Sequence, residues 1–152
     1  MKIIAAKLED ISAIVAMLAD DKLGEKREDF QDPLPQTYVD AFLKIDIDQN
    51  QHLVVLVNES EQVIGTMQLS FITYLTYQGG TRAQIEAVRI HKDYRGQQLG
   101  KQLFNWAIQK TKDKGAHVLQ LTTDKQRPDA LRFYVDLGFK ASHEGMKMHF
   151  EY

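Results

Sequence analysis

Three strand-like stretches follow one another in the middle of the chain, with only short turns between them. Residues 52–57 are rich in β-branched side chains, the polar turn 58–62 leads into residues 63–75, and Gly79 and Gly80 precede a third stretch at 83–90. Connections this short join antiparallel strands, because parallel neighbours need a crossover of a dozen or more residues. The sequence therefore predicts an antiparallel meander at the centre of the fold.

Apolar residues at helical spacing lie on both sides of this meander. They predict helices that begin at residue 11 and cover 38–45, 99–114 and 128–137, and further short stretches predict strands at 2–6, 118–122 and 139–150. A chain of 152 residues suits one domain. The predicted fold is a single α/β (α+β) domain over residues 1–152, with a mixed, mostly antiparallel sheet flanked by about four helices.

Composition excludes several classes of site and partner. The chain has no cysteine, which excludes disulfides, thiolate zinc sites, iron–sulfur clusters and a cysteine nucleophile. Its five histidines show no metal-ligand spacing, so we expect no metal site. Charged residues interrupt the apolar N-terminus, so we expect neither a signal peptide nor a membrane span, and a cytoplasmic protein. With 19 basic and 21 acidic residues and no basic cluster, nucleic acid is not an expected partner.

The most informative segment is the loop 94–101 between the strand at 83–90 and the following helix. The first turn of a helix leaves backbone N–H groups unpaired, and these can bind a phosphate. Gly100 costs about 1 kcal/mol against alanine within a helix, which suits a ligand approaching the backbone, although a plain turn remains the alternative. A Walker motif is excluded because Arg95 replaces its first glycine and Gln102 its Ser or Thr. The spacing of Gly96 and Gly100 does not fit a dinucleotide fingerprint.

These residues resemble the acetyl-CoA motif of the GCN5-related N-acetyltransferases (GNAT), in which Gln or Arg is followed by two residues, Gly, any residue, and Gly or Ala. Arg95 and Gly100 match this motif, and Gln98 replaces its middle glycine. The segment 127–139 is similar to a second block of the family, Asn, two residues, Ala, two residues and Phe-Tyr, then a later Gly-Phe, with Arg127 in place of Asn. The resemblance covers the element order of about residues 1–150. Residues 127–134, with Asp124 just ahead of them, are similar to those of a branch that acts on small amines and includes aminoalkylphosphonate acetyltransferases.

The resemblance implies acetyl-CoA as cofactor, a small primary amine as acceptor, and a homodimer. It implies that N–H groups of residues 96–101 hold the pyrophosphate and that the main chain of residues 88–90 pairs with the pantetheine arm. A bulge near Ala87 would expose the N–H of Val88 to the oxyanion. The implied cofactor residues are Val88, Arg89, Ile90, Arg95, Gly96, Gln97, Gln98, Leu99, Gly100, Lys101, Arg127, Ala130 and Phe133.

Acetyl transfer to an amine also needs an acid and a base. With the resemblance, Tyr134 is the candidate acid, because a phenol of pKa near 10 stays protonated at neutral pH and can donate to the departing thiolate; on spacing alone it reads as a core aromatic. Glu86 is the candidate base, acting directly or through water, with a solvated strand carboxylate as the alternative. Asp124 is the second candidate base.

The acceptor site is predicted to lie between the irregular segment 20–38 and the turn from Tyr74 to Arg82, with Asp124 nearby. Acidic residues at 20, 21, 25, 28, 29 and 32 would attract a cationic amine, whereas Lys22, Lys26, Arg27 and Arg82 would hold a phosphonate or carboxylate. An ordinary solvated surface is the third reading. Two rival functions stay open: acetylation of a protein N-terminus or lysine, and a non-catalytic domain that binds acetyl-CoA for regulation.

Overall fold

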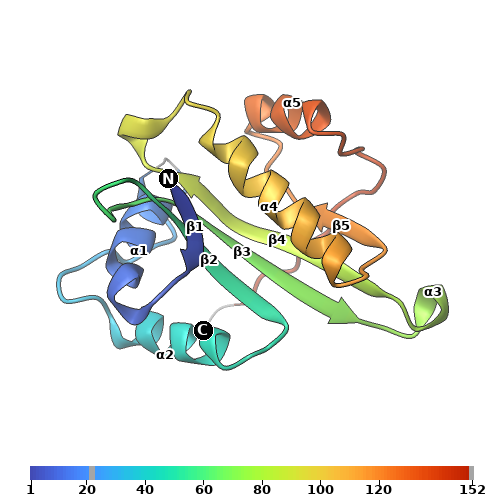
Figure 1. The fold of residues 1–152 in the computed structure, drawn as a ribbon, viewed down its shortest axis with the longest axis horizontal. Helices are drawn as coiled ribbons and strands as arrows, with labels where there is room; N and C mark the ends of the chain where they lie inside the picture. The colour runs from blue at the N-terminus through green and yellow to red at the C-terminus, as the bar shows by residue number, and fades with distance from the viewer. Residues whose placement is uncertain (21–22, 151–152) are drawn as a thin grey trace.

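A five-stranded sheet forms the centre of the computed structural model, which describes residues 1–20 and 23–150 (Figure 1). The strands lie side by side in chain order: β1 Lys2–Ala5, β2 Gln51–Val57, β3 Val63–Thr73, β4 Thr81–Ile90 and β5 Val118–Leu121. Strands β1 to β4 pair antiparallel, and β5 pairs parallel with β4. The predicted meander and the mixed sheet are confirmed.

The helices match the four that the apolar spacing predicts, with one short addition. They are α1 Ile11–Ala19, α2 Gln36–Asp46, α3 Thr76–Gly79, α4 Leu99–Asp113 and α5 Pro128–Asp136. The addition, α3, is a single turn at the tip of the β3–β4 hairpin, where Tyr77 and Gln78 have left-handed backbone angles. In the described part of the chain, no helix is both long enough and apolar enough to cross a membrane.

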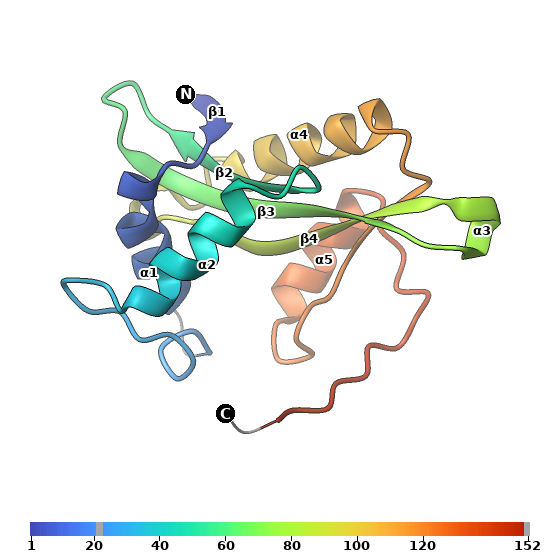
Figure 2. The ribbon, with the colours of Figure 1, turned by 90° about the horizontal axis from the view of Figure 1, so that it is seen from below.

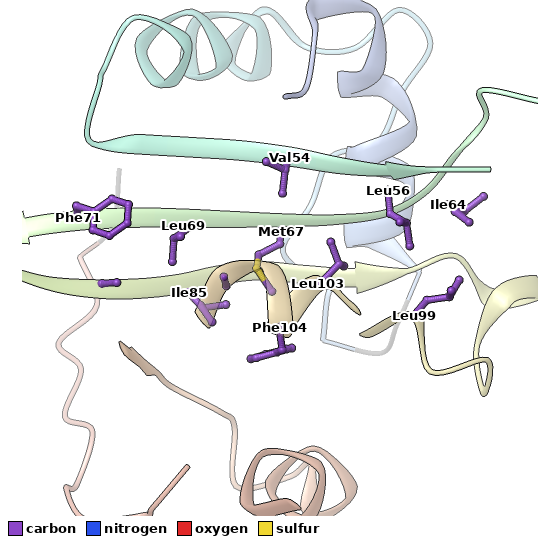
Figure 3. Packing of buried hydrophobic residues seen from close by; sticks show 12 residues of the cluster. Val54, Leu56, Ile64, Met67, Leu69, Phe71, Ile85, Leu99, Leu103 and Phe104 are labelled. Atoms are coloured by element: carbon purple, nitrogen blue, oxygen red, sulfur yellow. The ribbon is translucent and has the colours of Figure 1, made fainter. Parts of the chain in front are cut away.

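The main core lies between the sheet and α4. Successive side chains of a strand point to opposite faces, so Met67 and Leu69 of β3 and Ile85 of β4 meet Leu103 and Phe104 of α4, all of them nearly inaccessible to solvent (Figure 3). Burying large apolar side chains such as these contributes about 1.5–3 kcal/mol each. The strong helical periodicity of residues 99–110 therefore reflects this contact.

A second, smaller core occupies the opposite face. Ile14 of α1 and Phe42 of α2 pack against Val55 and Val57 of β2. Figure 2 shows the result, with α4 on one side of the sheet and α1 and α2 on the other. The two helices do not cover the whole face, because Gln84 and Glu86 of β4 and Gln120 of β5 form a hydrogen-bonded row on it outside this cluster.

The predicted last strand is wrong, because residues 139–150 form no strand. Residues 146–150 have the alternating pattern of a strand, but a strand is stabilised by pairing with a neighbour, and none of the described strands pairs with residues 139–150. Figure 2 shows the chain after α5 running away from the sheet towards the C-terminus.

Candidate active site

A β-bulge interrupts the end of β4. Gln68 of β3 pairs with Glu86, and Thr66, two residues away, pairs with Arg89. Two residues of β4 therefore face one residue of β3, and the first of them, Ala87, has a φ of 54°. The bulge predicted near Ala87 is confirmed. A bulge leaves a residue outside the regular ladder and bends the strand. The backbone around Val88 therefore does not follow the regular pairing pattern of the rest of β4.

The last half of β4 also lacks a neighbour on its other side. Pairing with β5 runs from Arg82, opposite Val118, to Ile85, opposite Leu121. Strand β5 ends there, whereas β4 continues to Ile90. Among the described residues, the backbone of 86–90 therefore presents an open edge, the kind of surface to which an extended ligand adds as a further strand.

The loop after β4 holds two left-handed residues just before α4. Gly96 has a φ of 77°, and Gln98 has a φ of 59° as the residue preceding the helix. The left-handed region costs a residue with a Cβ about 1–2 kcal/mol, which explains physically why glycine is usual at the position of Gln98. The side chain of Gln98 makes no capping hydrogen bond. The first N–H groups of α4 thus keep their capacity to bind an anion.

A cavity of about 340 Å³ lies between this loop, the end of β4 and α5. Its lining residues are Ile90, Tyr94, Arg95, Gly96, Gln98, Leu99, Gly100, Lys101 and Phe133. A Cβ at Gly100 would lie 3.4 Å from Cζ of Phe133, so any larger side chain there would fill the space. A pyrophosphate fits this lining, because the cavity offers the cations Arg95 and Lys101, the first N–H groups of α4, and open space at Gly100.

The cavity gathers eight of the predicted cofactor residues and adds one. Tyr94 was not assigned from the sequence, although it stands at the start of the motif, and its hydroxyl accepts a hydrogen bond from Nδ2 of Asn58 at 3.1 Å. The other predicted cofactor residues, Val88, Arg89, Gln97, Arg127 and Ala130, do not line the cavity.

Two arginine side chains bind carbonyl groups near the end of β4. Nη1 of Arg89 donates to the carbonyl of Val88 at 2.8 Å, and Nε of Arg95 donates to that of Ile90 at 3.1 Å. Arg95 also forms an ion pair with Asp20, at 2.8 Å between Nη2 and Oδ2. These contacts link the open edge of β4, the loop and the end of α1.

Tyr134 is half-buried on α5, in an aromatic cluster. Its ring centroid lies 5.5 Å from that of Phe104, 5.6 Å from Phe133 and 6.2 Å from Phe139. Burial raises the pKa of its phenol, and the charges of Arg127 and Arg89 act on it in the opposite direction. Its hydroxyl has no hydrogen-bond partner within residues 1–20 and 23–150. Tyr134 therefore packs as a core aromatic and also presents an unpaired, protonated phenol.

Glu86 belongs to a row of hydrogen-bonded side chains on the face of the sheet opposite α4. Nε2 of Gln84 donates to Oε1 of Glu86 at 3.0 Å, and Nε2 of Gln120 on β5 donates to Oε1 of Gln84 at 2.7 Å. Gln84 and Gln120 are paired neighbours in the parallel ladder. The row fixes one oxygen of an otherwise exposed carboxylate. Sequence reasoning missed both glutamines, since their only signal is that they alternate with core residues of β4 and β5.

The predicted acceptor residues do not come together. Tyr74 and Arg82 lie at the tip of the β3–β4 hairpin, where the Tyr74 hydroxyl contacts Nε2 of His117 and the Arg82 guanidinium lies 5.2 Å from the Tyr74 ring centroid. Arg82 precedes Val88 by six positions along β4, which is about 20 Å at roughly 3.3 Å per residue. Asp124 lies instead before α5, where its Oδ1 accepts from the N–H of Gln126 at 2.8 Å.

Some charges of the segment 20–38 are paired, one pair lying within the segment and another joining Asp20 to Arg95. Arg27 forms an ion pair with Glu28 at 2.6 Å, and the Tyr38 hydroxyl donates to Glu28 at 3.1 Å. Burial and the neighbouring carboxylates raise the pKa of Tyr38, against a hydrogen bond from Asp29 that lowers it. Asp21 and Lys22, also predicted for this site, lie outside the described residues.

Comparison with known proteins agrees with the geometry. The model of the Acetyltransferase (GNAT) family matches residues 19–139. An aminoalkylphosphonate N-acetyltransferase of Salmonella typhimurium is 29% identical over 138 residues, 91% of this chain and 84% of the relative. An L-amino acid N-acyltransferase of Escherichia coli, MnaT, is 31% identical over 85 residues, which are 56% of this chain and 49% of the relative.

Solved structures share the fold over nearly the whole chain. A crystal structure described as a transcriptional regulator from Bacillus halodurans C-125 is 56% identical, with a TM-score of 0.95, and the match covers 98% of this chain and 99% of that one. A glucosamine-6-phosphate N-acetyltransferase from Arabidopsis thaliana is 18% identical, with a TM-score of 0.76 and coverage of 99% and 98%. At that identity the second match shows the fold alone.

Proposed function

Because the chain belongs to the GNAT family of acetyltransferases, we propose that it transfers the acetyl group of acetyl-CoA to the primary amine of a small molecule. The observation that carries the proposal is the combination of an open edge at residues 86–90 with the cavity at the start of α4. An extended arm and a pyrophosphate, the two parts of coenzyme A that a protein must hold, match these two features.

In this proposal the main chain holds the cofactor. The N–H groups of residues 96–101 bind the pyrophosphate, with Arg95 and Lys101 adding positive charge. The backbone of Val88, Arg89 and Ile90 pairs with the pantetheine arm. Arg127, Ala130 and Phe133 contact the cofactor from α5. The carbonyl of Val88 already accepts from Arg89, so that guanidinium moves aside or shares the oxygen when the arm binds.

The chemical step is assigned to three groups. The N–H of Val88, released from the ladder by the bulge, donates to the oxyanion that forms when the amine attacks the thioester. Tyr134 protonates the departing sulfur, supported by the burial that raises the pKa of its phenol. Glu86 removes a proton from the amine, directly or through water, while Gln84 holds its carboxylate.

The acceptor is proposed to bind on the polar face beside Glu86, on the side of Asp124, whose carboxylate is the second candidate base. A small amine is favoured by the relative that acts on aminoalkylphosphonates. Tyr74 and Arg82 contact the acceptor only if it extends about 20 Å along β4, by the rise of roughly 3.3 Å per residue. We also propose a homodimer and a cytoplasmic location.

The first test is the melting temperature with and without acetyl-CoA. At about 100 times its dissociation constant a ligand stabilises by roughly 2.7 kcal/mol, which for a domain of this size shifts the melting temperature by about 5–10 °C. An amine library and a peptide array, both read by thiol release, then separate a small-molecule acceptor from a protein one. No shift at millimolar acetyl-CoA would overturn the cofactor site.

A second candidate is a domain that binds acetyl-CoA for regulation without turnover. The description of the Bacillus halodurans structure as a transcriptional regulator favours it. This candidate predicts a thermal shift with acetyl-CoA but no thiol release with any amine or peptide. Turnover with one acceptor, lost in Tyr134→Phe, would exclude it.

A further inference from the structure

A continuous patch of polar side chains lies on the face of the sheet opposite α4. One row crosses four strands through residues that are partners in the strand register, and in the next row Glu86 of β4 lies opposite Gln68 of β3. Each of these side chains is at least partly exposed. This patch, the polar floor, consists of Gln51, Gln68, Ser70, Gln84, Glu86 and Gln120.

A carboxylate fixes the amides in one half of the polar floor. Asp48, just before β2, accepts from the N–H of Asn50 at 2.9 Å and from Nε2 of Gln51 at 3.2 Å, and these hydrogen bonds lower the pKa of its carboxyl group. A carboxylate accepts and cannot donate, so Gln51 turns its nitrogen towards Asp48. Its oxygen then accepts from Nε2 of Gln68 at 2.6 Å. The orientation of the Gln68 amide is therefore fixed as well.

Glu86 fixes the other half in the same way. Nε2 of Gln84 donates to Glu86 at 3.0 Å, and Oε1 of Gln84 accepts from Nε2 of Gln120 at 2.7 Å. Each series thus begins at a carboxylate and ends at an amide. Within residues 1–20 and 23–150, Oε1 of Gln68 and Oε1 of Gln120 accept from no other residue. Each terminal amide can therefore offer a ligand this oxygen and the second hydrogen of its Nε2.

The arginines of this face do not belong to the polar floor. Arg82 lies at the hairpin tip, with its guanidinium 5.2 Å from the ring centroid of Tyr74. Nη1 of Arg89 donates to the carbonyl of Val88. The polar floor itself combines one carboxylate with neutral amides and a hydroxyl. A phosphonate or carboxylate bound there would accept only, and it would lie beside the like charge of Glu86.

A hydroxyl group is the complement of the terminal amides. It both donates and accepts, as each of these amides does, whereas a second ammonium group can only donate. Gln68 and Gln120 are on the strands on either side of β4, about 10 Å apart at the spacing of roughly 4.8 Å per strand. A compact molecule with hydroxyl groups on both sides of its amine can therefore approach both amides from above Glu86.

We propose, resting on the acetyltransferase function proposed above, that the acceptor is a small amino alcohol. Its primary amine lies at Glu86, and its hydroxyl groups bind the amides of Gln68 and Gln120. These two glutamines take no part in the chemical step. They select the acceptor by the hydrogen bonds that they exchange with its hydroxyl groups.

Two matched pairs of amines test the selection, with thiol release measured at saturating acetyl-CoA. Serinol is isopropylamine with two added hydroxyl groups, and aminoethylphosphonate carries a phosphonate where ethanolamine carries a hydroxyl. Rates are expressed per concentration of unprotonated amine, because hydroxyl groups also lower the pKa of an amine. On that scale kcat/KM should be about tenfold or more higher for serinol than for isopropylamine, as expected for two added hydrogen bonds. It should also be higher for ethanolamine than for aminoethylphosphonate. Equal values in the first pair, or a preference for the phosphonate, would overturn the inference.

Substitutions assign the preference to the polar floor. Gln120→Leu and Gln68→Leu should each lower kcat/KM for serinol several-fold more than for isopropylamine, and the ratio cancels any effect on the orientation of Glu86. Gln109→Leu, the same change on α4 where the amide donates to Asp113, should keep the wild-type ratio. A wild-type ratio in both floor variants would refute the role of these glutamines.

The same assays separate this inference from the function on which it rests. If the enzyme acetylates amines without preferring those with hydroxyl groups, the acetyltransferase proposal stands and the amino alcohol is excluded. If acetyl-CoA gives no thermal shift and no amine is acetylated, both proposals fall.

Discussion

Tyr134→Phe removes a single oxygen from the candidate active site and leaves the rest of the side chain in place. The ring keeps its packing against Phe104, Phe133 and Phe139. The hydroxyl has no hydrogen-bond partner in the described part of the chain, so its removal leaves no polar group stranded. We therefore expect the free energy of unfolding to change by less than about 1 kcal/mol. The thermal shift with acetyl-CoA should also stay the same.

The turnover number should respond very differently. A positioned acid or base contributes roughly 10²–10⁴ to a rate, which corresponds to about 2.7–5.4 kcal/mol of activation free energy at 1.36 kcal/mol per factor of ten. The phenol holds its proton throughout the neutral range, because burial raises its pKa above the ordinary value of 10.0. Loss of this proton donor should therefore lower kcat at every pH from 7 to 9, while KM for acetyl-CoA changes little.

The assay is thiol release with the best acceptor from the amine screen, at saturating acetyl-CoA. Tyr77→Phe is the matched control, since it makes the same change on the exposed tip of the β3–β4 hairpin. An unchanged kcat in Tyr134→Phe refutes the role of the phenol as the acid. A parallel loss of kcat and of the thermal shift would instead assign Tyr134 to packing or cofactor binding.

Three further substitutions test the surroundings of Glu86, Gly100 and His52. Gln84→Leu removes the amide that orients Glu86, and should lower kcat about tenfold with KM for acetyl-CoA unchanged, whereas Gln109→Leu, which loses a contact with Asp113 on α4, should not. Gly100→Val fills the cavity against Phe133, and should abolish the thermal shift with acetyl-CoA while the protein still melts cooperatively. Burial and the charges of Lys110 and Lys114 lower the pKa of His52, so the unfolded chain binds more protons below about pH 6.5 and stability falls as the pH drops. Urea unfolding at pH 7.5 and 5.0 should show a smaller fall in His52→Gln.

The periodicity of apolar residues and the turn residues were enough to predict most of the fold. Residues 52–90 combine strand-like stretches with short turns, as an antiparallel meander requires. Helix α4 has apolar residues at helical spacing because one of its faces packs on β3 and β4. The predicted strand at residues 139–150 was wrong, because apolar alternation shows that a segment suits a sheet but not whether a neighbouring strand pairs with it. Strand pairing is a tertiary interaction, and its partner is outside the reach of local periodicity.

The candidate site also has a part that the local sequence predicts and a part that depends on strand pairing. The loop 94–101 could be predicted because consecutive residues build it, and the bulge at Ala87 because the resemblance implied it. Gln120 could not be predicted, because its contact with Gln84 depends on the strand register that places the two residues opposite each other. Arg82 was predicted for the acceptor site as part of the turn from Tyr74, yet it lies at the end of β4 opposite to Val88. Distance along a strand, unlike distance around a turn, grows with every residue.

Backbone strain by itself does not identify the site. Ala87 and Gln98 have positive φ angles, but so do Tyr77 and Gln78 at the hairpin tip. Each costs about 1–2 kcal/mol for a residue with a Cβ, and at the tip the turn alone accounts for it. At Ala87 the strained residue takes Val88 out of a ladder whose other side is already open, and at Gln98 it directs the unpaired N–H groups of α4 into a cavity. Strain at these two positions leaves backbone groups available at the end of β4 and at the start of α4, and one extended ligand that binds both sets would offset the cost of the strain. The acetyl-CoA proposal depends on that coincidence.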